Sequence, residues 1–179
     1  MTDSVPSTDH ILERTLRVYF QTNPQKSILV NVLFHRGKVS LRLLDYLCTN
    51  YSKHNNASYE LKKESSTASA RTFHIYQSYK TQLKTFSKKF FDPFCRRDRI
   101  DIVVRDEVYH KDLQVLTTIG QLNFFRWCIH NKVYEYALQH HEQIEKEMNQ
   151  VLQRRTLHKH SEGAKKESVG SSDFLVSFR

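Results

Sequence analysis

The side chains best suited to bind a ligand lie between Lys80 and Arg99, where basic residues outnumber acidic ones. Two residues of this segment are acidic, Asp92 and Asp98, and seven are basic: Lys80, Lys84, Lys88, Lys89, Arg96, Arg97 and Arg99. Lysines that recur every four residues share one side of a helix and can follow a phosphate backbone as point charges. Arginines placed after the helix can each hold a phosphate through two parallel hydrogen bonds. The pattern predicts a phosphate-binding surface.

The alternative for this segment is a solvated helix face that binds nothing, with an arginine paired to Asp98 or Asp101. Its aromatic side chains mostly favour a structural role, because five apolar residues are spaced three and four apart on one stripe of a helix: Tyr76, Tyr79, Leu83, Phe86 and Phe90. Only Phe91 and Phe94 fall off this stripe, so they are the candidates for stacking on a nucleic-acid base.

A second arrangement that could contact nucleic acid is the helix pair expected between Thr118 and Arg155, with a break near Asn131. Its first helix carries residue types that read base edges: Gln121, Asn123 and Arg126. The break is very short, however, and the second helix is too long and not basic enough for a recognition helix. We therefore expect these side chains to pack within the fold.

Motifs for metal binding and catalysis are weak. The local clusters of potential ligands lack the paired spacing of a zinc site: Cys128 with His130, His140 with His141, and His158 with His160. The sequence has no glycine-rich phosphate loop, GxSxG or HExxH pattern. Four carboxylates that could hold Mg²⁺ alternate with arginines, which favours salt bridges: Asp98, Asp101, Asp106 and Glu107. We expect no metal, no cofactor and no catalytic residue.

The elements that position these residues predict an α+β fold with about five helices and a small, mostly antiparallel sheet. Alternating residues predict strands at 16–20, 57–61 and 99–105, and the end of the chain, 173–179, could return as an edge strand. Helices are expected at 24–36, from Ser40 to about 51, and at 76–90, 118–130 and 133–155, with Asn23 as one N-cap. Residues 63–71 are expected to form an exposed loop. The organisation predicted is a flexible 1–13, one basic domain at 14–155 and a polar tail at 156–172.

The overall charge indicates an acidic partner. The 179 residues include 28 Lys and Arg against 19 Asp and Glu, a net charge of +9, and ten His besides. Nucleic acid or an acidic protein face would be attracted to such a chain. Its three cysteines are widely spaced and predict no disulfide framework. Neither a secretory signal nor an apolar run of about 18 residues is present, so we expect neither secretion nor a membrane span.

Three blocks of the chain resemble an uncharacterised protein family of nucleocytoplasmic large (giant) DNA viruses. They are Lys38–Asp45 running into Thr49–Lys53, then Phe90–Arg97, and finally Thr117–Trp127. The resemblance implies a viral protein made in the host cell, located in cytoplasm or nucleus, that could be packaged in the virion. It brings no catalytic residues.

Taken together, these features predict a non-enzymatic nucleic-acid-binding protein, for DNA rather than RNA, that holds phosphates through Lys80–Arg99 with help from Arg36 and Lys38. The alternative is a structural or scaffold protein. In that case its basic face and long C-terminal helix would bind an acidic viral or host protein, or assemble the chain into a homo-oligomer.

Overall fold

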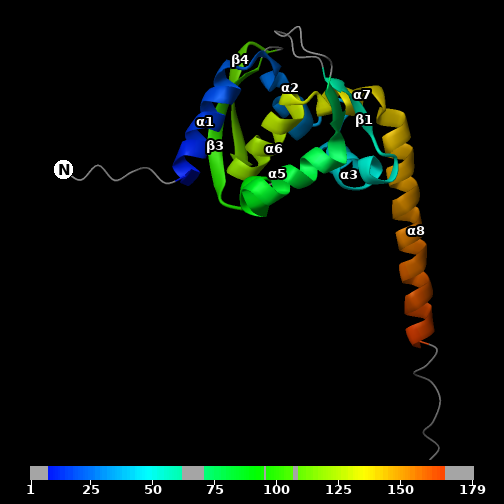
Figure 1. Ribbon diagram of the computed structural model, residues 1–179. Helices are drawn as coiled ribbons and strands as arrows, with labels where there is room; N and C mark the ends of the chain where they lie inside the picture. The colour runs from blue at the N-terminus through cyan, green and yellow to red at the C-terminus, as the bar shows by residue number, and fades with distance from the viewer. Residues whose placement is uncertain (1–7, 62–70, 95, 107–108, 168–179) are drawn as a thin grey trace, which may run out of the picture.

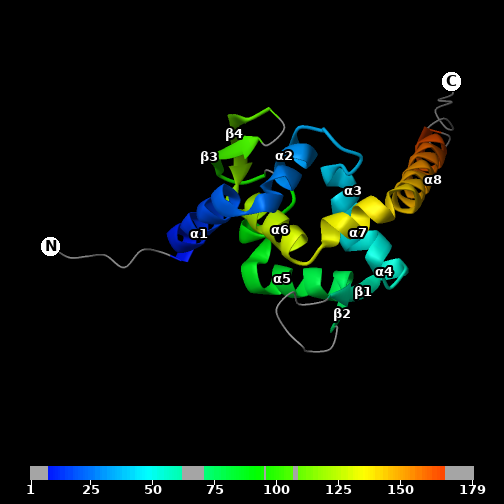
Figure 2. The same ribbon diagram turned by 90° about the horizontal axis from the view of Figure 1, so that it is seen from above.

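The fold is α+β, as predicted, and it contains more helices than the five or so expected. The structure is a computed structural model that describes residues 8–61, 71–94, 96–106 and 109–167, with side chains as far as Arg154. Two antiparallel hairpins lie apart, on either side of a buried central helix (Figures 1 and 2). In this described part, no helix is long and apolar enough to cross a membrane.

The first element is a helix, α1 (Thr8–Thr22), so the strand predicted at 16–20 is wrong. Leu16 and Phe20 are both buried, and their separation of four places them on one helical face. The five-residue alternation was too short to distinguish this spacing from a strand. The helix also replaces the flexible segment expected up to residue 13, while residues 1–7 lie outside the described part.

The helices expected on either side of Gly37 are confirmed, including their caps. Asn23 accepts a hydrogen bond from the Gln25 backbone N–H and begins η1 (Pro24–Lys26), which continues into α2 (Ser27–Leu33). Ser40 caps α3 (Leu41–Tyr46), which passes through the π-helical turn η2 (Leu47–Tyr51) into α4 (Ser52–His54). The left-handed residue that ends the first pair is His35, with φ 54°, rather than Gly37.

The single sheet predicted from segments near 16, 57 and 99 is wrong, because each strand pairs with its neighbour in the chain. β1 (Ser58–Leu61) pairs with β2 (Arg71–His74), part of which was expected to be loop. β3 (Arg99–Asp106) pairs with β4 (Lys111–Thr118), which the sequence analysis did not predict. The edge strand proposed at 173–179 lies outside the described residues.

Three helices follow β4, where two were expected. α6 (Ile119–His130), capped by Thr118, is buried on almost every side, as its apolar residues predicted. The break expected near Asn131 is present, and the left-handed residue in it is Lys132, with φ 58°. α7 (Val133–Gln139) ends at His140, and α8 (His141–Glu167) then runs away from the body over about 40 Å (Figure 1). Residues 156–167 are therefore helical rather than an irregular tail.

Aromatic side chains centre the core on Trp127 of α6. Its ring lies 6.1 Å from that of Tyr79, 5.7 Å from Phe91 and 6.0 Å from Phe124, measured between centroids. Tyr79 comes from α5 (Ile75–Phe90), so this cluster fixes that helix against α6. The packing decides which side of α5 faces the core and which remains exposed.

Candidate nucleic-acid interface

The predicted lysines of α5 lie on its exposed side. Tyr79 is buried and Leu83 and Phe86 are half-buried, whereas Lys80, Lys84 and Lys88 are exposed. The Trp127 indole N–H donates to the Ser78 hydroxyl at 3.1 Å, which fixes the rotation of the helix about its axis. The predicted separation of a core stripe from a lysine stripe is therefore present along the first three turns.

The helix is interrupted at Ser87, so the lysine stripe does not continue unchanged. Ser87 has φ 56° and ψ 173°, a backbone conformation that non-glycine residues rarely adopt. Its hydroxyl accepts a hydrogen bond from the Lys89 backbone N–H at 3.3 Å, and this bond starts a new helical turn after the interruption. Lys89 Nζ lies 2.9 Å from an Asp9 carboxylate oxygen and 4.6 Å from the centre of the Phe90 ring. Its charge is thus already compensated.

The loop after α5 is held by buried polar groups of α6. The Asn123 side chain donates to the Phe90 carbonyl at 2.8 Å, and Gln121 donates to the Pro93 carbonyl at 2.7 Å. The Asp92 backbone N–H donates to the Gly120 carbonyl at 3.2 Å. Gln121 and Asn123 are therefore committed to positioning this loop and are not free to read base edges.

Arg96 also forms an ion pair, and its carboxylate partner was not among those predicted. Its guanidinium makes two hydrogen bonds to the buried Asp92 carboxylate, at 2.9 and 3.0 Å. This hydrogen bonding raises the pKa of Arg96, which keeps it charged. Within the described residues, Asp98 and Asp101 form no ion pair, so the pairing proposed for them is replaced by Asp92.

Neither aromatic candidate for base stacking is freely available in this loop. Phe91 is fully buried against Phe124 and Trp127. Phe94 is half-buried, so much of its ring is closed to a base. We therefore assign both rings to packing and to holding the loop.

Arg36 and Lys38 are not brought together with the other predicted residues. Arg36 Nη1 lies 2.5 Å from an Asp106 carboxylate oxygen, at the end of β3. Arg99 begins the same strand, about 23 Å away at 3.3 Å per residue. Arg36 and Lys38 consequently mark a separate surface at the far end of the β3–β4 hairpin.

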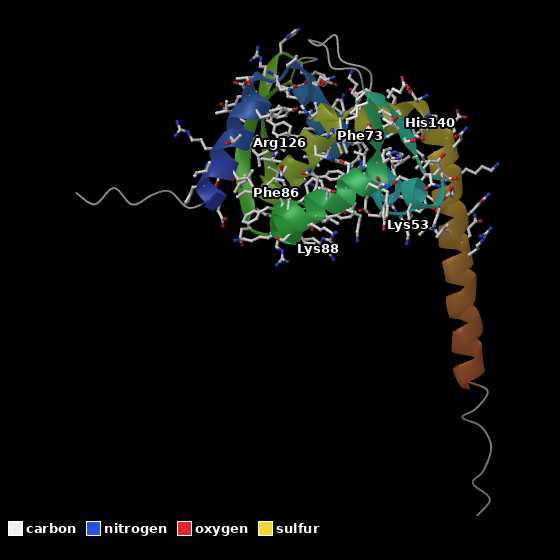
Figure 3. The ribbon with its side chains drawn as sticks, viewed as in Figure 1. Lys53, Phe73, Phe86, Lys88, Arg126 and His140 are labelled. Carbon is white, nitrogen blue, oxygen red and sulfur yellow. The ribbon has the colours of Figure 1, made fainter. Side chains whose placement is uncertain are left out.

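Apart from Lys38, the predicted cations that bind no described carboxylate are Lys80, Lys84, Lys88, Arg97 and Arg99, and the structure adds one cation that the sequence did not predict. Lys53 of α4 places its ammonium 6.0 Å from the centre of the Tyr76 ring, at the start of α5. Figure 3 shows Lys53 and Lys88 along the lower edge of the body, with α5 between them. The end of α5 meets the start of β3 at one corner (Figure 1). We name the cationic row as Lys53, Lys80, Lys84, Lys88, Arg97 and Arg99, which are all exposed and make no ion pair with another described residue.

Two other features of the described residues concern potential metal ligands and the surface groove. No group of three His, Cys, Asp or Glu side chains gathers within the part of the chain that the structure places.

A wide groove of about 1140 Å³ runs between β2, the first turns of α5 and the turn before α7. Its lining mixes amide and hydroxyl side chains with apolar ones such as Phe73 and Ile129 and with charged ones such as Arg71 and Glu135, and it includes no residue of the cationic row.

Comparison with known proteins places the chain in a family. A model described as "Family of unknown function (DUF7197)" matches residues 5–174. The chain belongs to this family. It is also 32% identical, over 149 residues, to "Uncharacterized protein L507" of Acanthamoeba polyphaga mimivirus, and the match covers 83% of this chain. The resemblance to an uncharacterised giant-virus family is thereby confirmed.

The match covers 56% of the mimivirus protein, so the chain spans just over half the length of this relative. No solved structure matches the chain.

Proposed function

We propose that this chain is a non-enzymatic nucleic-acid-binding protein that contacts phosphates through the cationic row. The observation that carries the proposal is the row itself: six exposed cations, on α4, on α5 and in the segment that leads into β3, form no ion pair with another described residue. Figure 3 shows two of them, Lys53 and Lys88, along the lower edge of the body. Because grouped like charges repel one another and raise the local positive potential, a polyanion is favoured as the ligand. We no longer propose phosphate contacts for Lys89, Arg96 and Arg36, because each of these side chains already binds a carboxylate.

DNA remains the proposed ligand rather than RNA, and the row suits a duplex backbone. Lys80 and Lys84 are about 6 Å apart along α5, close enough to bind neighbouring phosphates of one strand. The cationic row includes no side chain that we assign to a base edge, so we propose that it contacts phosphates without sequence preference.

The salt dependence of binding tests this proposal. If all six cations neutralise phosphates, the logarithm of the association constant should fall against the logarithm of salt concentration with a slope of about −5. Fluorescence anisotropy with a labelled duplex measures this slope. The double substitution Lys84→Gln with Arg97→Gln should reduce it by about 2 units. A slope unchanged by these substitutions would rule out the row.

A second candidate function, assembly, is favoured by α8. The helix is 27 residues long and extends beyond the body, and of its side chains described as far as Arg154, those of Ile144 and Met148 near its start are buried. Such a helix could join copies of the chain or dock on an acidic viral or host protein. Light scattering after size exclusion would favour this scaffold function if it finds a stable oligomer that α8 truncation at Gln153 dissociates, together with no retention on heparin.

A further inference from the structure

The tip of the β3–β4 hairpin carries a second group of aromatic and basic side chains. The Phe34 ring, at the end of α2, is 43% exposed, and the Tyr109 ring, in the hairpin turn, is 61% exposed. Both rings lie at one end of the molecule with Arg36 between them, and neighbouring exposed rings are more informative than a single one. We name Phe34, Arg36, Tyr109 and Lys111 the tip cluster.

Cations lie against both rings of the tip cluster. The Arg36 guanidinium carbon lies 5.4 Å from the centre of the Phe34 ring and 5.0 Å from that of Tyr109. The Lys111 ammonium lies 5.5 Å from the Tyr109 ring. His35, Lys38 and His110 are exposed in the same two turns. The cluster therefore combines flat apolar faces with positive charge.

A buried carboxylate organises this arrangement. Asp106 is only 3% exposed, and its carboxylate accepts hydrogen bonds from Arg36 Nη1 at 2.5 Å and from the Tyr109 backbone N–H at 3.3 Å. One side chain thus holds both the Arg36 guanidinium and the backbone N–H of Tyr109. Less backbone freedom at Tyr109 would therefore be lost when a ligand stacks on its ring.

We propose that the tip cluster binds an unpaired base of single-stranded nucleic acid, with the base stacked on Tyr109 and an adjoining phosphate held by Lys111. Aromatic rings beside cations are what sequence-tolerant single-strand binding requires, since every base offers a flat face. This inference rests on the proposed nucleic-acid binding and adds a contact about 23 Å from Arg99, at the other end of β3. It differs from the cationic row because it depends on bases as well as phosphates.

A purely structural cluster is the alternative, and the choice of ligand separates the two. A labelled dT 12-mer and an abasic 12-mer carry the same phosphates, but only the first carries bases. The wild-type protein should bind the dT 12-mer roughly 5- to 100-fold more tightly than the abasic one, the range expected for stacking of one base. Tyr109→Leu should abolish this preference, and Tyr109→Phe, which keeps the ring, should retain it.

Each outcome of this experiment bears on a different claim. A preference for dT that survives Tyr109→Leu, or no preference in the wild type, would overturn the tip cluster while leaving the cationic row standing. Binding of neither 12-mer nor of a duplex would instead refute the proposed function itself. Equal melting temperatures of the two Tyr109 variants would exclude unfolding as the cause of any loss. Retention of an acidic peptide in place of oligonucleotides would assign the cluster to a protein partner and overturn the inference.

Discussion

A side chain at Gly120 should destabilise the fold, because α6 begins in close contact with the loop that follows α5. A Cβ atom at this position would lie 3.0 Å from the Lys89 carbonyl oxygen, 3.3 Å from the Asp92 nitrogen and 3.4 Å from the Phe91 nitrogen. These neighbours are backbone atoms, and hydrogen bonds from Gln121 and Asn123 pin the segment. The loop therefore cannot withdraw without loss of those bonds.

The magnitude follows from two opposing terms. Overpacking of a well-filled site costs about 1 to 3 kcal/mol, and the helix propensity of alanine over glycine returns up to about 1 kcal/mol. We expect Gly120→Ala to lower the free energy of unfolding by about 1 kcal/mol. For a chain of this length, that corresponds to a fall of roughly 2 to 4 °C in Tm. Urea denaturation and a thermal melt measure both quantities.

Gly37 supplies a matched control with the same substitution. A Cβ there would meet only the Tyr134 hydroxyl at 3.6 Å, an ordinary contact, and the residue has no positive φ. Gly37→Ala should therefore raise the free energy of unfolding by about 0.4 to 1 kcal/mol, through the unfolded chain. If Gly120→Ala stabilised the protein as much as Gly37→Ala, the close approach of α6 to the loop would be refuted.

Two further predictions concern stability. Ser87→Gly should raise the free energy of unfolding by about 1 kcal/mol in urea denaturation, because glycine adopts φ 56° without strain. Thr85→Gly, at a regular helical position, should lower it. Loss of stability in both variants would contradict the kink at Ser87. Burial raises the pKa of Asp45 above 3.8, so its charged form destabilises the fold. This penalty is absent below the unfolded pKa and complete above the folded one. Asp45→Asn should therefore stabilise the protein at pH 7 and not at pH 3; equal effects at both pH values would refute this.

Helix caps and long amphipathic periods could be predicted from the sequence, whereas partners across the chain could not. The cap at Asn23 and the helix starts at Ser40 and near Thr118 were predicted because a cap depends on atoms two or three residues away. The strand pairing failed because β2 and β4 carry little alternation of their own, and their partners β1 and β3 were identified without them. Short windows such as 16–20 fit helix and strand equally.

The candidate site was predicted in part for the same reason. The lysines of α5 follow from helical spacing, and their exposure agrees with it. The ion pair of Lys89 with Asp9 joins residues 80 apart in the sequence, and that of Arg36 with Asp106 joins residues 70 apart. Such long-range contacts leave no local pattern. Lys53 was missed because its place beside Tyr76 depends on the packing of α4 against α5.

Protection of lysines from acetylation tests most directly whether the cationic row is the nucleic-acid interface. The protein would be acetylated with and without a short DNA duplex, and modification at each lysine would be measured by mass spectrometry. We predict strong protection at Lys53, Lys80, Lys84 and Lys88. The exposed Lys132 and Lys146, which lie outside the row, should be modified equally in both samples. Protection of Lys132 and Lys146 with none along α5 would contradict the account.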